Sequence, residues 1–465
     1  MTTFPVEDAL EKLSLEPDAP SVDEVQVPPP QPTPPQISIQ DRLERASKAA
    51  ALNLSELRSP EWVSALDNWR NLQRTPPWEH LHYSVNVGDH VALDRSEAKV
   101  FLNRPVNYLK KFDLSRGWRR YEFVPKTARP PGGSKLEAIR LWEVENNRKL
   151  DADVIFSRHT MVQLMCHGFG LQGIDSGSKV ILTRFKGRLH VELYKKTCIS
   201  RSPGTMAGYN FEQIMTERQF VPPTTNATKY NSMVMHQITI DGKTVRVLSS
   251  SEADACKSLE FNKFDAYSVL NNYLELKSWV SLDRKRITKA RIQCYLGGVS
   301  TLVVGHRDPQ SHHLLDVVTV DALEKAPQRR GKLTRACSRK YMNRLLAYLI
   351  QWLRLSTEIL ACGNDDVPEH FVLVKDGENL TIKPTTVEEH PEVALMLSQE
   401  YVQWANTLEE GSESSVNNTN NGSESSIPDR NAPPARHKKS GSRRKHSHRP
   451  RQPREESQAG SDLSK

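Results

Sequence analysis

The sequence predicts an α+β fold in which antiparallel hairpins alternate with helices along the chain. Three hairpin signals carry this prediction, because in each one two apolar, alternating segments flank a short glycine-containing turn. The predicted hairpins span residues 179–194 around Gly187, 237–248 around Asp241-Gly242 and 371–382 around Asp376-Gly377. Asp-Gly is a strong turn signal, since both residues tolerate a positive φ angle.

Helices are predicted where apolar residues recur at helical spacing around these hairpins. The predicted helices cover residues 39–58, 134–150, 204–217, 287–296, 341–355 and 389–408. Ser134, followed three residues later by Glu137, is expected to cap the second of them. Residues 154–165 contain Arg158 and then a helical stretch. Further strands are expected at 245–252, 273–279, 299–306 and 315–320.

Composition changes along the chain divide it into four parts. Residues 1–37 are acidic and then proline-rich, which predicts a disordered segment. Residues 38–79 are expected to form a helical N-terminal extension, and residues 80–408 to form the globular domain. Residues 409–465 are Ser/Asn-rich and then basic without apolar interleaving, so they are predicted to be a disordered tail.

The overall composition narrows the function classes. The formal net charge of +8 and the isoelectric point near 9.0 suit a polyanionic partner, although the basic tail supplies much of that charge. The six cysteines are scattered without a CxxC or Cys/His cluster, so neither zinc nor a disulfide framework is indicated. No apolar run reaches the ~18 residues of a membrane span, and the N-terminus lacks a signal-peptide core. We therefore expect a soluble, intracellular protein.

Residues 245–279 hold the strongest candidate for chemistry. Residues two apart in a strand share a face, so Glu252 and Asp254 can point into one site, as can Glu275 and Lys277. Carboxylates can hold Mg²⁺ or Mn²⁺ while an ammonium group holds the attacking water or the phosphate, which is what metal-assisted phosphodiester hydrolysis requires. Without a cation these carboxylates would repel one another and their pKa values would rise. The cluster therefore implies a metal, or else these residues do not meet.

Each of these motifs alone also has a simpler interpretation. Glu-x-Lys occurs on many strands as a solvated face or a cross-strand ion pair. Glu212 would suit the first turn of a helix, where the helix dipole favours an acid. Arg158 is uninformative by itself. Lys289 and Gln293 are four residues apart and so lie on one helical face, which is also common on surfaces.

Taken in order, the motifs resemble the decapping nuclease family, which includes the DXO-type proteins and a nuclear fungal relative that partners a 5′→3′ exoribonuclease. The resemblance covers roughly residues 80–405 and rests on five motifs. They are Arg158, Gly208-Tyr209-Asn210-Phe211-Glu212, Glu252-Ala253-Asp254, Glu275-Leu276-Lys277, and a segment with Lys289, Gln293, Gly298-Val299 and Gly305-His306-Arg307-Asp308.

The chain departs from the family pattern at two of these motifs. The family usually has Trp-Arg-Gly where this chain has Ser157-Arg158-His159, and Phe where it has His306. The missing tryptophan is expected to alter contacts near the 5′ nucleotide, which leaves the favoured 5′ end open. Every carboxylate and the lysine are kept, so an active enzyme is expected.

The resemblance implies a fold of two twisted, mixed β-sheets flanked by helices, with an active centre like that of restriction endonucleases. It also implies hydrolysis with Mg²⁺ or Mn²⁺, through two ions, of incomplete or unmethylated caps, NAD caps or triphosphates at RNA 5′ ends. The implied metal ligands are Glu212, Asp254, Glu275, the Leu276 backbone carbonyl and, through water, Glu252. Lys277 would position the nucleophile, and Arg158, Lys277 and Gln293 would hold the RNA.

Two other functions remain open at this point. One is a catalytically weak scaffold that binds RNA and stabilises a 5′→3′ exoribonuclease. The other is a DNA endonuclease with the same carboxylate and lysine chemistry, which the ordered motifs disfavour. The basic cluster Arg443-Arg444-Lys445 in the tail favours a nuclear location, with a cytoplasmic one as the alternative.

Overall fold

The computed structural model describes residues 38–69, 71–86, 88–120, 133–175, 178–195, 202–218, 228–322 and 338–413. The predicted disordered segment 1–37 lies outside the described residues, as does the basic tail from residue 414 onward. Across the described ranges, none of the helices combines the length and the apolar character that a membrane span needs.

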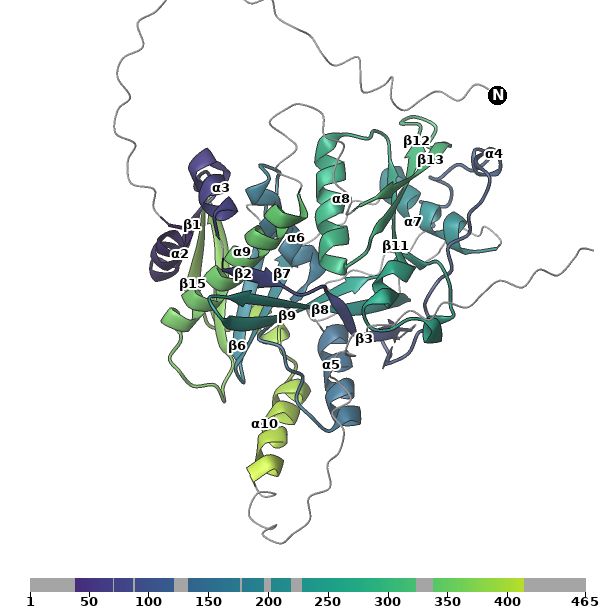
Figure 1. Ribbon diagram of the computed structural model, residues 1–465. Helices are drawn as coiled ribbons and strands as arrows, with labels where there is room; N and C mark the ends of the chain where they lie inside the picture. Colours follow the sequence, from purple (N-terminus) through teal and green to yellow (C-terminus); the bar gives the residue numbers. More distant parts are fainter. Residues whose placement is uncertain are drawn as a thin grey trace, which may run out of the picture. The chain divides into compact units, whose positions relative to one another are not determined.

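A large mixed sheet of eleven strands runs through the centre of the fold (Figure 1). Ten of its strands, in spatial order, are β1 (Ala51–Asn53), β15 (Asn379–Pro384), β14 (Glu369–Asp376), β6 (Ser178–Phe185), β7 (Arg188–Lys195), β5 (Val154–Ser157), β9 (Lys243–Glu252), β8 (Lys229–Ile240), β3 (Trp78–Val85) and β4 (Val91–Ala92), and β2 (Leu72–Arg74) pairs beside β8. β5 runs parallel to both β7 and β9, whereas the other neighbours are antiparallel. The carboxyl-terminal ends of β5 and β9 therefore lie next to each other.

A second, smaller sheet has four strands: β10 (Ala255–Cys256), β11 (Tyr273–Trp279), β12 (Thr301–Arg307) and β13 (Leu314–Asp321). β11 and β12 are parallel, and the other two pairings are antiparallel. Both sheets are thus mixed, and the predicted α+β fold with two mixed sheets and flanking helices is confirmed.

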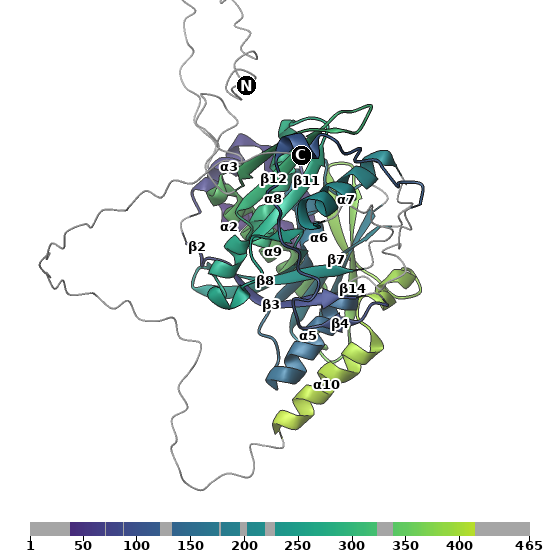
Figure 2. The same cartoon turned by 90° about the vertical axis from the view of Figure 1, so that its right-hand side faces the viewer.

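Helices cover both faces of the large sheet. The described helices are α2 (Ile39–Lys48), α3 (Pro60–Asp67), α4 (Val106–Leu109), α5 (Gly133–Asn146), α6 (Arg158–Gly168), α7 (Pro203–Thr216), α8 (Arg284–Gly297), α9 (Arg339–Leu360) and α10 (Gln399–Glu413). α2, α3, α6 and α9 pack on one face in a core that buries Trp62 and Trp352. α5 and α10 pack on the other face, and Figures 1 and 2 both show these two helices side by side.

The three predicted hairpins are all present, and their turns explain why. Asp241 and Gly242 between β8 and β9 have φ angles of 49° and 79°, the left-handed conformation that a two-residue hairpin turn needs. Lys186 and Gly187 adopt the same conformation between β6 and β7, at 50° and 71°. The hairpin turn therefore fixes the register of β9, which carries Glu252.

Three details of the predicted helices are wrong. The predicted helix 39–58 ends at Lys48, because Ala50 turns left-handed at φ 47° and Leu52 then enters the sheet beside β15. Ser134 is not an N-cap, since α5 already includes Gly133. The predicted helix 389–408 is a 3-10 turn at Pro391–Leu395 followed by α10, which runs on to Glu413.

The predicted N-terminal extension contributes to the main core. Trp62 and Trp69 are buried there with residues of α2 and α9, and β1 adds an edge strand to the large sheet. Trp78 begins β3, an internal strand that the sequence patterns did not indicate.

Candidate active site

The predicted site residues lie where the two sheets approach each other. Arg158 is the first residue of α6, directly after β5, and Glu252 is the last residue of β9. Because β5 and β9 are parallel neighbours, both residues lie at the carboxyl-terminal ends of these strands, on the same side of the sheet. The small sheet supplies Glu275 and Lys277 from the middle of β11.

Glu275 is the most buried carboxylate of the group, with its side chain 1% exposed. Its Oε2 atom accepts a hydrogen bond from Arg158 Nη1 at 2.6 Å, and its Oε1 atom lies 2.5 Å from Lys277 Nζ. Burial alone would raise the pKa of Glu275, but Arg158 and Lys277 outweigh it and hold that pKa below its usual range. Glu275 is therefore an ionised carboxylate compensated by two cations.

Asp254 lies in the link between β9 and β10 and points at the same lysine. Its Oδ2 atom accepts a hydrogen bond from the Leu276 backbone N–H at 2.8 Å and lies 3.2 Å from Lys277 Nζ. Burial and the neighbouring charge of Glu275 nevertheless raise the pKa of Asp254 to about 6. The Leu276 carbonyl, a predicted metal ligand, accepts from Lys277 Nζ at 3.0 Å.

Glu212 is brought to the cluster by α7, and the two residues before it anchor that helix. Asn210 is buried and donates to the Leu114 and Arg116 carbonyls. Phe211 packs against β12 so tightly that a Cβ atom at Gly305 would overlap its ring. Burial and the charge of Asp254 raise the pKa of Glu212 well above its usual range.

The position of Glu212 decides between its two interpretations. α7 begins at Pro203, so Glu212 is far beyond the first turn and the helix-start interpretation is wrong. The carboxylates of Asp254, Glu252 and Glu275 all act on its pKa, so Glu212 faces the same cluster.

Glu252 and Asp254 do not share a strand face, because β9 ends at Glu252. The Glu252 side chain is 41% exposed and lies 2.8 Å from Lys229 Nζ, whereas its backbone carbonyl accepts from Arg158 Nη2 at 3.2 Å. Asp254 instead turns inward, with its side chain 9% exposed. Of the two acidic residues, Asp254 is therefore buried in the site, whereas Glu252 lies at its solvent-exposed side.

Gln293 lies on α8, one helical turn before Gly297. Gly297 packs against Arg158, since a Cβ atom there would fall 3.3 Å from Arg158 Nη1. Residues four apart share a helical face, which places Gln293 on the side of α8 that faces Arg158. Gln293 itself is half-buried.

The donors suit a hard divalent cation, although they are not yet arranged as a cage. Among the described residues no group of three or more Asp, Glu, His or Cys side chains lies close enough to hold a metal ion. Lys277 instead stands between Asp254 and Glu275 as their counter-charge. The candidate donor atoms are all oxygens, and burial together with the neighbouring carboxylates raises the pKa values of Glu212 and Asp254, an effect that a bound cation would oppose.

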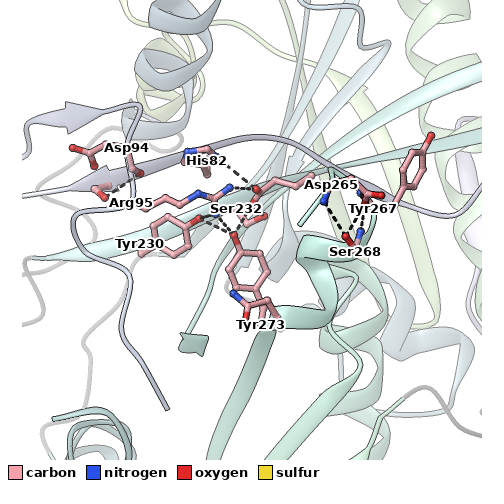
Figure 3. A network of polar contacts seen from close by, with 12 residues as sticks. His82, Asp94, Arg95, Tyr230, Ser232, Asp265, Tyr267, Ser268 and Tyr273 are labelled. Carbon is pink, nitrogen blue, oxygen red and sulfur yellow. Dashed lines mark hydrogen bonds and ion pairs between the residues drawn. The ribbon is translucent and has the colours of Figure 1, made fainter. Parts of the chain in front are cut away.

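A separate polar network fixes the strands beneath the site (Figure 3). Glu79 on β3 accepts from Ser232 Oγ, from the Tyr273 hydroxyl and from Arg95, at 2.8, 2.6 and 2.5 Å. The Tyr230 and Tyr273 hydroxyls lie 2.7 Å apart, and Arg95 donates to both of them. Because Tyr230 belongs to β8 and Tyr273 to β11, this network ties the large sheet to the catalytic strand of the small one.

Lys229 and the Glu79 network were missed in the sequence, for different reasons. The register of the second hairpin pairs Asn231 with Glu252, so counting two residues further back places Lys229 opposite position 254. The Asp241-Gly242 turn thus contained the signal for Lys229. The Glu79–Tyr273 contact joins residues far apart in the chain, and no local pattern indicates it.

Comparison with known sequences matches most of this chain. A family model described as "RAI1 like PD-(D/E)XK nuclease" matches residues 75–402. The curated "Decapping nuclease RAI1" of Candida albicans is 22% identical over 347 residues, which cover 64% of this chain and 85% of that protein. The family match begins just before β3 and ends in α10, so it includes the small sheet, the large sheet apart from β1 and β2, and all the predicted site residues.

Solved structures share the fold. Candida albicans Rai1 in complex with pU5 and Mn²⁺ superposes with a TM-score of 0.58 at 18% identity, covering 73% of this chain and 97% of that chain. Scheffersomyces stipitis Rai1 in complex with (3′-NADP)⁺ and a calcium ion superposes with a TM-score of 0.59 at 18% identity, covering 72% and 97%. At these identities the likeness establishes the common architecture.

Proposed function

Because the chain belongs to the RAI1-like PD-(D/E)XK nuclease family, we propose that it is a metal-dependent nuclease that removes caps from RNA 5′ ends. The proposed substrates are RNAs with incomplete or unmethylated caps, NAD caps or 5′ triphosphates. Hydrolysis of the phosphodiester bond after the first nucleotide releases the cap structure and leaves a 5′-monophosphate, which commits the RNA to quality control and decay. Further 5′→3′ degradation by the same site is part of the proposal.

The observation that carries this proposal is the uneven compensation of the buried carboxylates. Glu275 is fully ionised between Arg158 and Lys277, while Glu212 and Asp254 have raised pKa values. A purely structural ion-pair network would leave no carboxylate under-compensated, because uncompensated buried charge destabilises a fold. A site built to receive a divalent cation has this imbalance until the cation is present.

Each residue of the cluster has a role in this mechanism. Glu212, Asp254, Glu275 and the Leu276 carbonyl would hold Mg²⁺ or Mn²⁺, with Glu252 acting through water, and two ions are proposed. A bound divalent cation lowers the pKa of water and stabilises charge on the phosphate oxygens. Lys277 holds the attacking water and the developing negative charge on phosphorus. We propose that Asp254 and Glu275-Leu276-Lys277 are the PD-(D/E)XK motif residues of this chain.

Arg158 and Gln293 are proposed to contact the RNA phosphates. Arg158 donates to Glu275 and to the Glu252 carbonyl, so it orients the catalytic carboxylate at the same time. Gln293, on the adjacent face of α8, is positioned to reach the next phosphate along the strand. Phosphate contacts of this kind set the position of the RNA and carry no sequence preference.

The experiment that tests this function is a cleavage panel. Purified protein is incubated with Mg²⁺ or Mn²⁺ and with NAD-capped, unmethylated-cap and triphosphate RNA, alongside DNA of the same sequence. We expect RNA with a 5′-monophosphate as product, lost in Glu212→Ala and Asp254→Ala. Glu217→Ala is the matched control, since Glu217 follows α7 directly but is 41% exposed and pairs with Lys99. Equal cleavage by wild type and Asp254→Ala, or a preference for DNA, would contradict the proposal.

Two further proposals concern the cell. We propose that the protein partners a 5′→3′ exoribonuclease that consumes its product, with a catalytically weak scaffold as the alternative function. Co-purification after removal of residues 414–465 tests whether the globular part makes that contact. A nuclear location is proposed from the basic tail, and deletion of residues 436–454 should disperse the protein to the cytoplasm. An unchanged nuclear signal would remove that assignment.

A further inference from the structure

We propose that Lys229 has two successive roles. Before a divalent cation binds, its ammonium group is the counter-charge of Glu252, and after the cation has taken its place it binds a phosphate of the RNA substrate. This inference rests on the proposed metal-dependent nuclease function and adds a residue to its site. Lys229 is the first residue of β8, at the end of the strand that faces the carboxylate cluster.

Lys229 pairs with a carboxylate that solvent reaches. Its Nζ atom is 2.8 Å from Glu252 Oε2, and the two side chains are 17% and 41% exposed. Glu252, Tyr209 and Glu212 all act on the ammonium group and raise its pKa, so it also faces α7. Lys277, whose side chain is 24% exposed, pairs instead with Asp254 and Glu275, which are 9% and 1% exposed. The two lysines therefore neutralise different carboxylates, and the partner of Lys229 is the more exposed one.

The backbone that carries Lys229 is held in place. The next residue, Tyr230, points to the opposite face of β8, where Figure 3 shows its hydroxyl directed toward Tyr273 and Arg95. Asn231 then pairs in register with Glu252. Lys229 thus extends from a fixed backbone, and its ammonium group is held at 2.8 Å from Glu252 Oε2.

The charge balance gives Lys229 its second role. Four carboxylates (Glu212, Glu252, Asp254 and Glu275) face three cationic side chains (Arg158, Lys229 and Lys277). A divalent cation that recruits Glu252 directly or through water removes the partner of Lys229 and makes the net charge of the site more positive. The freed ammonium group then stands at the entrance beside a positively charged centre, where an RNA phosphate arrives.

A purely structural ion pair is the simpler interpretation, and it makes different predictions. The pair is partly buried, with Lys229 17% and Glu252 41% exposed, so in this interpretation its role is to hold β8 and β9 together. If the pair were only structural, removing the ammonium group would leave cation affinity and substrate affinity unchanged. If Lys229 competes with the cation and then binds phosphate, the two affinities change in opposite directions.

The test compares Lys229→Met and Lys229→Arg with wild type, and uses Lys243→Met as the matched control at the exposed far end of the same hairpin. Mn²⁺ binding without RNA is measured by titration calorimetry. We expect Lys229→Met to bind Mn²⁺ roughly 3- to 10-fold more tightly, because a competing positive charge is gone. Lys229→Arg and Lys243→Met should stay close to wild type.

Cleavage of triphosphate RNA at saturating Mn²⁺ is the second arm. Lys229→Met should raise KM about tenfold with kcat nearly unchanged, and the dependence of binding on salt should weaken by about one phosphate contact. Lys229→Arg should recover most of the loss in KM. Unchanged Mn²⁺ affinity and KM in Lys229→Met would overturn the role of Lys229 alone. Equal Mn²⁺ affinity in wild type and Asp254→Asn would overturn the proposed function as well.

Discussion

Two buried charge clusters each include a residue of β11, and the pKa values of their carboxylates shift in different directions. Tyr273 at the start of β11 belongs to the Glu79–Arg95 network, and Glu275 two residues later belongs to the carboxylate site. Burial would raise the pKa of Glu79, but His82 and Arg95 outweigh it and lower that pKa. In the carboxylate site burial prevails, and the pKa values of Glu212 and Asp254 rise.

The difference separates a structural network from a functional one. Every oxygen of the Glu79 carboxylate is hydrogen-bonded, so the network is complete as folded. The neighbouring site holds two buried carboxylates with raised pKa values, and we propose that it is completed by a cation. Mutations in the first cluster should therefore affect stability, and mutations in the second should affect chemistry.

The largest effect is expected from Asp254→Asn. Loss of this ligand should reduce cleavage by roughly a thousandfold or more, because the metal and the activated water are both lost. Stability should move the other way: the metal-free variant should gain about 1 to 3 kcal/mol at pH 7.5, since an ionised carboxylate with a raised pKa costs folding free energy. Single-turnover cleavage and urea denaturation measure the two quantities. A variant that is both inactive and less stable would show that Asp254 is structural.

Glu79→Gln should show the reverse pattern. It removes the counter-charge of Arg95 and replaces the oxygen that accepts from Arg95 with an NH₂ donor, while the amide oxygen can still accept from Ser232 and Tyr273, so we expect a loss of about 2 to 4 kcal/mol in the free energy of unfolding. Cleavage per folded molecule, measured well below the unfolding temperature, should stay within about threefold of wild type. Tyr273→Phe, which removes one hydroxyl, should cost only about 1 kcal/mol. A large loss of activity in folded Glu79→Gln would merge the two clusters into one functional unit.

Gly305→Ala tests how the packing of α7 on β12 positions Glu212 in the carboxylate cluster. The added Cβ atom would overlap the Phe211 ring, so α7 must shift and carry Glu212 with it. We expect a cost of about 1 to 3 kcal/mol in stability and a loss of roughly tenfold or more in cleavage. Gly208→Ala in the same helix adds a Cβ atom in open space and should be neutral or stabilising in thermal denaturation. Equal stability of the two variants would contradict the close packing of β12 on α7.

The pH dependence should be the smallest effect. The folded-state pKa of Asp254 is about 6, above its ordinary value of 3.8, so the folded protein holds this proton more tightly than the unfolded chain. The stability cost of ionising Asp254 is therefore present at neutral pH, begins to decrease as the pH falls through about 6 and is gone near pH 3.8. Mn²⁺ affinity should fall in the same window, by about tenfold per pH unit for one displaced proton. Affinity that is flat between pH 7 and 5 would exclude Asp254 as a ligand.

Local patterns in the sequence predicted much of this fold. The hairpins were predictable because Asp241-Gly242 and its counterparts dictate the turn conformation. The helix 39–58 was not, because Leu52 continues an apolar pattern while pairing with Leu380 on a distant strand. Strand pairing of that kind is decided by tertiary contacts rather than by local periodicity.

The site was predictable to a different extent. Glu275 and Lys277 share a strand face as expected, and Asp254 does meet them. The strand rule failed for Glu252 and Asp254, because β9 ends between them and their side chains diverge. Which cations neutralise which carboxylates depends on contacts between the sheets, and only the folded chain reveals those pairs.

The central claim is that the carboxylate cluster is incomplete until it holds a divalent cation. The most direct test is thermal denaturation of chelator-treated wild type, Asp254→Asn and Glu79→Gln at pH 7.5, with and without Mn²⁺. At a hundred times its dissociation constant, Mn²⁺ should stabilise wild type and Glu79→Gln by about 2.7 kcal/mol. Asp254→Asn should begin more stable than metal-free wild type and gain nothing from Mn²⁺. An equal Mn²⁺-dependent gain in Asp254→Asn would contradict the account.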